Sequence, residues 1–152
     1  MKEINEVQIL NLTSRKIVIK DLKLVSLAIM KHLSLSGELS LVLAADAKLR
    51  SLNRDYRGQD RVTDVLTFPA LKNIPNILGE IFINLADCER SYKYREVFDF
   101  KPSRNYLIFF LLIHGLLHLA GYSDEREKDR LEIVALGKKL LEKLIKEQII
   151  SV

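Results

Sequence analysis

Two patterns of apolar and polar residues take turns along the chain. In some stretches the two kinds alternate, which is typical of strands; in others apolar residues recur every three or four positions, which is typical of amphipathic helices. Glycine, proline and asparagine separate these stretches, as expected for turns. The pattern predicts strands over residues 4–10, 38–44, 65–68 and 78–83, and helices over residues 21–35, 46–56, 84–94, 104–120 and 125–148.

Single residues mark the expected helix ends. Asp21 and Asp46 precede apolar helical stretches, where a carboxylate can accept a hydrogen bond from a free backbone N–H, so both are predicted N-caps. Gly121 is expected to end the long apolar helix in the left-handed conformation. The order of elements predicts an α/β (α+β) fold, in which a single layer of about four mixed strands is covered by helices.

Length and composition narrow the protein class. The 152 residues contain no repeat, low-complexity tract or flexible linker, so we expect one domain over residues 1–152. With 48% hydrophobic and 29% charged residues, the chain is neither a disordered protein nor a coiled-coil rod. Cys88 is the only cysteine, which excludes a disulfide scaffold and fits a reducing compartment.

Net charge and targeting signals narrow the function only slightly. The net charge of +4 is compatible with an anionic partner such as nucleic acid but does not require one. The first residues include acidic side chains and lack the pattern of a signal peptide. The most apolar stretch, residues 106–120, is shorter than the ~20 residues that span a bilayer. We therefore expect a cytoplasmic protein with no membrane partner.

A histidine pair carries the strongest chemical signal. His114 and His118 lie four positions apart on the predicted apolar helix, so both side chains share one face and can bind the same Zn²⁺. Asp124, beyond the turn at Gly121, is a candidate third ligand. A chance pair of hydrogen-bonded core histidines is the alternative, and the spacing leaves both open. Gly115 occupies the position of the general-base glutamate of H-E-x-x-H zinc proteases, which argues against a peptidase.

An arginine-rich loop carries the second signal. Arg57 and Arg61 lie in a polar segment that follows a predicted helix, where a guanidinium can bind two phosphate oxygens. Acidic residues alternate with the arginines, so charge alone favours a solvated loop over a binding site. Thr63 and Asp64 are expected to shape the loop through hydrogen bonds from side chain to backbone. Three tyrosines further along can stack on bases or pack in the core or on the surface, and packing is the favoured interpretation: Tyr92, Tyr94 and Tyr106.

Three segments together resemble the YbeY family of bacterial ribosomal-RNA maturation endoribonucleases. They are LNRDYRGQDRVTDVLTFP (52–69), LGEIFIN (78–84) and HGLLHLAGYSD (114–124). The last is close to the family's H-G-x-L-H-L-x-G-Y-D-H. The resemblance covers residues 40–124 without interruption, and the combined pattern is far more specific than any one segment.

The resemblance implies a metal-dependent endoribonuclease that cuts single-stranded RNA. It implies one Zn²⁺ bound by His114, His118 and Asp124 on a central helix, with His114 counted as catalytic. Here the sequence departs from the family, whose third ligand is a histidine. Aspartate also binds Zn²⁺, but two histidines with one carboxylate accept other divalent metals too. Arg57 matches the family's functionally important arginine and is expected to bind substrate phosphate, with Arg61 beside it.

The resemblance also implies biological partners. These are single-stranded RNA, in particular a precursor of small-subunit ribosomal RNA, and the ribosome or ribosomal proteins. Two other functions remain open. One is a non-catalytic, RNA-binding ribosome-assembly factor with a structural or weakened metal site, and the other is a metal hydrolase acting on another substrate.

Overall fold

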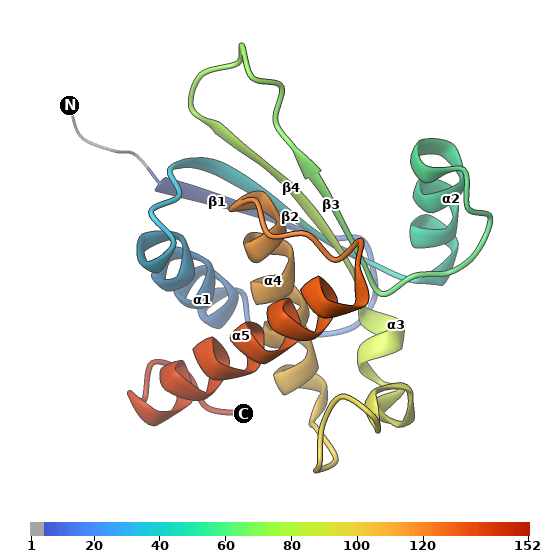
Figure 1. The fold of residues 1–152 in the computed structure, drawn as a ribbon, viewed down its shortest axis with the longest axis vertical. Coiled ribbons are helices and arrows are strands. Elements are labelled where there is room, and N and C mark those ends of the chain that lie inside the picture. The colour runs from blue at the N-terminus through green and yellow to red at the C-terminus, as the bar shows by residue number, and fades with distance from the viewer. Residues whose placement is uncertain (1–4) are drawn as a thin grey trace.

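The computed structural model describes residues 5–152. Its strands are β1 (Asn5–Asn11), β2 (Gly37–Ala44), β3 (Val65–Pro69) and β4 (Ile77–Asn84). They form one sheet in the order β1-β2-β4-β3, in which β3 alone runs antiparallel to its neighbour (Figure 1). The predicted fold class, one mixed layer of four strands covered by helices, is confirmed.

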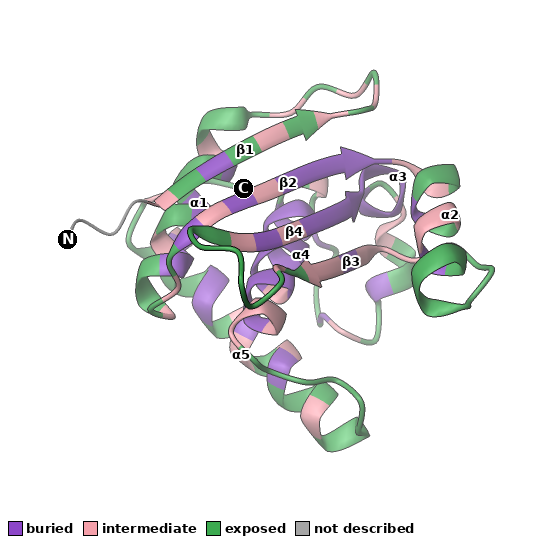
Figure 2. Cartoon of the chain, turned by 90° about the horizontal axis from the view of Figure 1, so that it is seen from above, coloured by how far each residue is buried: buried purple, intermediate pink, exposed green. Residues whose placement is uncertain are grey.

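The helices are α1 (Ile19–His32), α2 (Asp46–Arg57), α3 (Leu85–Cys88), α4 (Arg104–Leu119) and α5 (Glu127–Lys146), with a short 3₁₀ turn η1 (Ser91–Tyr94). Helices α1, α4 and α5 lie on one side of the sheet, whereas α2 lies at the end where β2 and β4 finish (Figures 1 and 2). Among residues 5–152, no helix is long and apolar enough to cross a membrane.

The sheet has a core on each face. Alternate residues of a strand point to opposite faces, so Leu41 and Ile81 join the large core while Val42 and Phe82 join a smaller one under α2. The C-terminal halves of β2 and β4, residues 41–44 and 81–84, are therefore buried on both faces (Figure 2). This explains why the second halves of these strands are nearly continuous apolar runs in the sequence.

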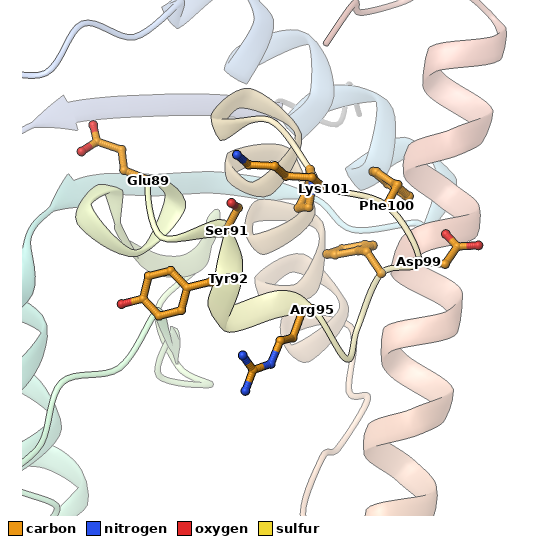
Figure 3. A pocket seen from close by; sticks show the side chains of 9 residues that line it. Glu89, Ser91, Tyr92, Arg95, Asp99, Phe100 and Lys101 are labelled. Atoms are coloured by element: carbon orange, nitrogen blue, oxygen red, sulfur yellow. The ribbon is translucent and has the colours of Figure 1, made fainter.

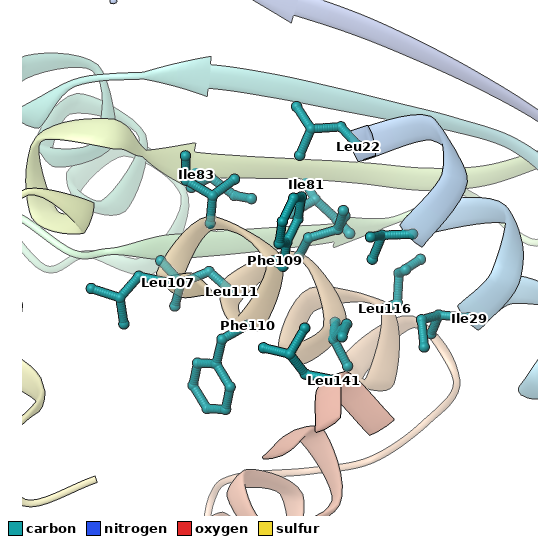
Figure 4. Packing of buried hydrophobic residues seen from close by; sticks show 14 of the residues in the cluster. Leu22, Ile29, Ile81, Ile83, Leu107, Phe109, Phe110, Leu111, Leu116 and Leu141 are labelled. Atoms are coloured by element: carbon teal, nitrogen blue, oxygen red, sulfur yellow. The ribbon is translucent and has the colours of Figure 1, made fainter. Parts of the chain in front are cut away.

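Helix α4 runs through the large core and positions the histidines. Eleven of its 16 residues are buried, and its side chains pack among those of β4, α1 and α5 (Figure 4). Gly115 faces β4: a Cβ at this position would lie 2.9 Å from two side-chain carbons of Ile81. The glycine thus lets α4 approach the sheet closely, and a glutamate here would enter the core.

The helix ends differ from the predictions in several places. Asp21 lies inside α1, which begins after Val18 and has no side-chain cap. Asp46 is the first residue of α2 rather than its cap, and its carboxylate instead pairs with Arg90. Ser103 caps α4 by accepting a hydrogen bond from the Tyr106 N–H. Gly121 follows the C-cap of α4 with φ +102°, as predicted.

The helix predicted over residues 84–94 is interrupted. Asn84 caps the single turn of α3, and a separate turn, η1, begins at Ser91. The buried Asp87 carboxylate accepts hydrogen bonds from Arg90 and Lys93, which ties the two turns together. The predicted strand over residues 4–10 is β1, although residue 4 lies outside the described residues.

Candidate metal centre

The two histidines of α4 face each other. Their Nε2 atoms are 3.1 Å apart, and both side chains are largely buried. The Nδ1 of His118 lies 3.0 Å from the backbone oxygen of Tyr122. A carbonyl only accepts hydrogen bonds, so this nitrogen carries a proton, and in the neutral ring the Nε2 of His118 keeps its lone pair.

Asp124 brings a carboxylate to the same point. One of its oxygens is 3.3 Å from the Nε2 of His118 and 3.8 Å from that of His114. The turn after α4 makes this approach possible, because Gly121 reverses the chain and the Tyr122 N–H bonds back to the Leu117 carbonyl. One atom from each of the three residues lies within 4.8 Å of the other two.

The electrostatic environment keeps His114 neutral. The pKa of its imidazole is lowered to about 4, mainly by burial and also by the neighbouring His118, while Asp124 opposes both effects. A neutral imidazole is the form that binds metals. The Nδ1 of His114 is buried and has no hydrogen-bond partner among residues 5–152, so the Nε2 is its only nitrogen in contact with the other candidate ligands.

The spacing of the three atoms suits a metal ion. With bonds near 2.0–2.1 Å, two ligands of a tetrahedral Zn²⁺ are about 3.3–3.4 Å apart. The separations here are 3.1, 3.3 and 3.8 Å. Two imidazole nitrogens and one carboxylate oxygen also form a suitable donor set for several divalent cations. The residues present therefore fit a metal ion without rearrangement of α4.

A cavity of about 150 Å³ adjoins the histidines, and the sequence did not reveal its other walls. His114 and Asp124 line it together with Asp64, Tyr94 and Arg130, which come from three further segments. The Tyr94 hydroxyl donates a 2.9 Å hydrogen bond to Asp64, and burial raises the pKa of that carboxyl group. Asp64 thus contacts a tyrosine beside the candidate centre, and Tyr94 is packed as favoured from the sequence.

The arginine-rich loop lies apart from this group. Arg50 pairs with Asp60 and Arg54 with Asp55, so the alternating acids neutralise these two arginines. Arg57 and Arg61 are exposed and form no ion pair within the described chain; the guanidinium of Arg61 donates its hydrogen bonds to the side chain of Gln59. Neither arginine lines the cavity beside His114, whereas Arg130 does. The structure thus brings the three predicted ligands together. It leaves the two predicted phosphate-binding residues as exposed cations without an ion-pair partner among residues 5–152, Arg57 at the end of α2 and Arg61 in the loop that follows.

Comparison with known proteins agrees with the three motifs. A family model described as Endoribonuclease YbeY matches residues 2–145. The Endoribonuclease YbeY of Rhodospirillum rubrum is 38% identical over 112 residues, which is 68% of this chain and 54% of the relative. That of a Sulfurihydrogenibium species is 32% identical over 136 residues, 86% of each protein. This chain therefore spans about half the length of the first relative and most of the second.

A solved structure extends the likeness to the fold. The solution structure of a protein from Thermotoga maritima is similar to this one with a TM-score of 0.62 and 30% sequence identity. The match covers 93% of this chain and 90% of the other.

Proposed function

Because this chain belongs to the YbeY family, we propose that it is a metal-dependent endoribonuclease that cleaves single-stranded RNA. The observation that carries the proposal is the convergence of His114, His118 and Asp124, with donor atoms 3.1–3.8 Å apart. This group stands beside a cavity and within reach of solvent through the exposed Asp124.

Each residue of the group has a distinct part in holding the metal. His114 and His118 present their Nε2 atoms from a rigid, buried helix, and the Tyr122 carbonyl holds the ring of His118 in the required tautomer. Asp124 contributes a negative charge from the following loop. A divalent cation bound there supplies Lewis-acid polarisation of a phosphoryl group.

Arginine side chains bind the substrate in this proposal. Arg57, with Arg61 beside it, binds a phosphate of the RNA strand and offsets the negative charge that develops during cleavage. The support is that both guanidiniums are exposed and unpaired within residues 5–152 while Arg50 and Arg54 are neutralised. Arg130 lines the cavity beside His114, so it is a further cation that the reacting phosphate can meet.

The finer assignments follow from the family. We propose Zn²⁺ as the resident ion, a ribosomal-RNA precursor as the substrate and the cytoplasm as the location. The His₂-carboxylate donor set supports zinc without excluding manganese or iron. The single, buried Cys88 supports a reducing compartment.

The test is cleavage of an end-labelled, unstructured RNA by the purified protein. The reaction is run with and without a chelator, beside His114→Ala purified in the same way. We expect cleavage that is lost in both controls and is restored to the chelated wild type by one divalent metal. Cleavage that persists in His114→Ala would reject the proposed centre. RNA binding without cleavage under any metal would favour the assembly-factor alternative.

The phosphate-binding role needs its own comparison. Arg57→Ala is expected to lower kcat/KM about 10- to 100-fold, the effect of losing a charge-assisted contact to phosphate, with the metal content unchanged. Arg54→Ala is the matched control, because it removes an arginine of the same helix that is already paired with Asp55. Equal activity of the two variants would reject the role of Arg57.

A further inference from the structure

A second cavity lies away from the histidines. It measures about 700 Å³ and opens between η1 and the segment that leads into α4 (Figure 3). Tyr92 and Arg95 line it from the first segment, and Phe100 and Lys101 from the second. Its size falls within the range of about 300–1,000 Å³ that is usual for small-ligand pockets, so it can hold one or more nucleotides.

Two aromatic rings at this cavity are open to solvent. Tyr92 is 66% exposed and Phe100 is 46% exposed. The Phe100 ring is nevertheless held in place, because it packs against Phe98 and Tyr106 with ring centroids 5.4 and 5.2 Å away. A fixed, half-exposed ring loses little conformational freedom when a base stacks on it, and every base has a face that can stack.

The charges around the cavity favour an anionic ligand. Arg95 and Lys101 form no ion pair with an acidic side chain among residues 5–152. The acidic Glu89 at the rim is already paired with Arg15 at 3.0 Å and Arg104 at 3.9 Å. The charged lining residues, Glu89, Arg95, Asp99 and Lys101, sum to zero, and the positive excess comes from the two arginines paired with Glu89.

The cavity is joined to the candidate metal centre by two elements. The short segment 94–98 contributes to the walls of both cavities: Tyr94 and Val97 line the one beside His114, and Arg95 and Phe98 line this one. Helix α4 begins two residues after Pro102 and carries His114 ten positions further along, which is about 15 Å. An RNA strand bound at the centre can therefore reach the cavity within a few nucleotides.

We propose that this cavity is a second binding site for the substrate strand, where bases stack on Tyr92 and Phe100 and phosphates contact Arg95 and Lys101. The inference rests on the proposed ribonuclease function. In this proposal, these residues bind the single-stranded RNA at a distance from the bond that is cleaved. Aromatic faces interleaved with cations are the combination by which proteins bind single strands without reading their sequence.

The experiment measures binding and cleavage separately. Binding of a long, fluorescein-labelled oligouridine is followed by anisotropy in the presence of a chelator, so that no cutting occurs. Tyr92→Leu is expected to raise Kd about 5- to 100-fold, the loss that accompanies one stacked base, whereas Tyr92→Phe keeps the wild-type value. Arg95→Ala with Lys101→Ala should reduce the slope of log K against log salt by about 1.4.

Further variants sharpen the assignment. Asp99→Asn removes a negative charge from the lining and should tighten RNA binding. Lys139→Ala is the control for net charge, because it removes one positive charge, as Lys101→Ala does, but from the exposed face of α5. It should leave the slope of log K against log salt nearly unchanged, since Lys139 does not contact the strand in this proposal.

Cleavage of two RNA lengths then separates the outcomes. A short oligouridine that cannot extend about 15 Å from the centre should be cut equally by the wild type and Tyr92→Leu, while the long one is cut less well by the variant. Unchanged Kd and salt slope in the variants would overturn the proposal, whatever else the cavity binds. If the variants weaken RNA binding as expected but the wild type cleaves neither RNA, the cavity is an RNA-binding site and the ribonuclease proposal fails.

Discussion

A methyl group added at Gly115 is expected to destabilise the protein through a single neighbour. The Cβ of Gly115→Ala would lie 2.9 Å from the Cδ1 and Cγ2 of Ile81 and 3.2 Å from its Cγ1. Carbon atoms in contact prefer about 3.5–4.0 Å, and Ile81 is fully buried, so it cannot move into solvent. Overpacking of this kind costs about 1–3 kcal/mol, whereas alanine in place of glycine inside a helix gains about 1 kcal/mol.

The opposing effects can be separated by changing Ile81. Ile81→Ala alone should lower the free energy of unfolding by about 2–5 kcal/mol, because it leaves a cavity. In that background the same Gly115→Ala change should raise the free energy of unfolding by about 1 kcal/mol, since the clash is gone and the helix propensity remains. The substitution is therefore expected to reverse its sign between the two backgrounds, which is a coupling between contacting residues.

Equilibrium denaturation in urea of the wild type, both single variants and the double variant measures this coupling. Gly137→Ala on α5 is the matched control: its added Cβ would come no closer than 3.4 Å to Phe110, so it should keep the helical gain without a clash. If Gly115→Ala changed the free energy of unfolding equally in both backgrounds, the contact with Ile81 would not be what requires the glycine.

Three other predictions follow from the same geometry. Burial, together with the neighbouring His118, lowers the folded-state pKa of His114 from 6.5 to about 4, so on acidification the unfolded chain takes up a proton at this residue before the folded chain does. The metal-free protein should lose about 2–3 kcal/mol of stability as the pH falls from 6.5 to 4. Denaturation of the wild type and of His114→Gln at each pH measures this loss, and an equal dependence of stability on pH in the two proteins would contradict the prediction. Asp124→His should bind Zn²⁺ tighter relative to Mn²⁺, because a nitrogen replaces a carboxylate oxygen; competition between the two ions, read by metal analysis, checks this. Ser103→Ala removes the cap of α4 and should cost about 1 kcal/mol, or about 2–4 °C in Tm for a chain of this size, measured by calorimetry.

The long elements could be predicted because each follows one dominant periodicity. The strands β2 and β4 and the helices α4 and α5 each bury a face against the core. Apolar residues therefore recur in the sequence with the spacing of a strand or a helix. The break between α3 and η1 has no such pattern of apolar residues to mark it. It depends on the buried Asp87, whose carboxylate is bound by Arg90 and Lys93, and these partners become apparent only in the folded chain.

The candidate site also has a part that could be predicted from the sequence and a part that could not. His114 and His118 are neighbours through the pitch of one helix, so their spacing in sequence was sufficient to pair them. The remaining walls of the cavity, Asp64, Tyr94 and Arg130, belong to three segments that meet only through the tertiary fold. Asp64 could be interpreted from sequence only as a loop residue, and its hydrogen bond to Tyr94, 30 positions away, had no local signal.

The candidate ligands differ in how costly they are to change. His114 and His118 are embedded in the helix that forms the core, so replacing either one disturbs packing as well as chemistry. Asp124 stands on the loop after Gly121, with 47% of its side chain exposed, and has no part in that packing. Substitutions at position 124 should therefore change the candidate ligand set at little cost in folding stability. An exchange at this one loop position is therefore expected to change which metal the candidate centre prefers, while the helix beneath it stays the same.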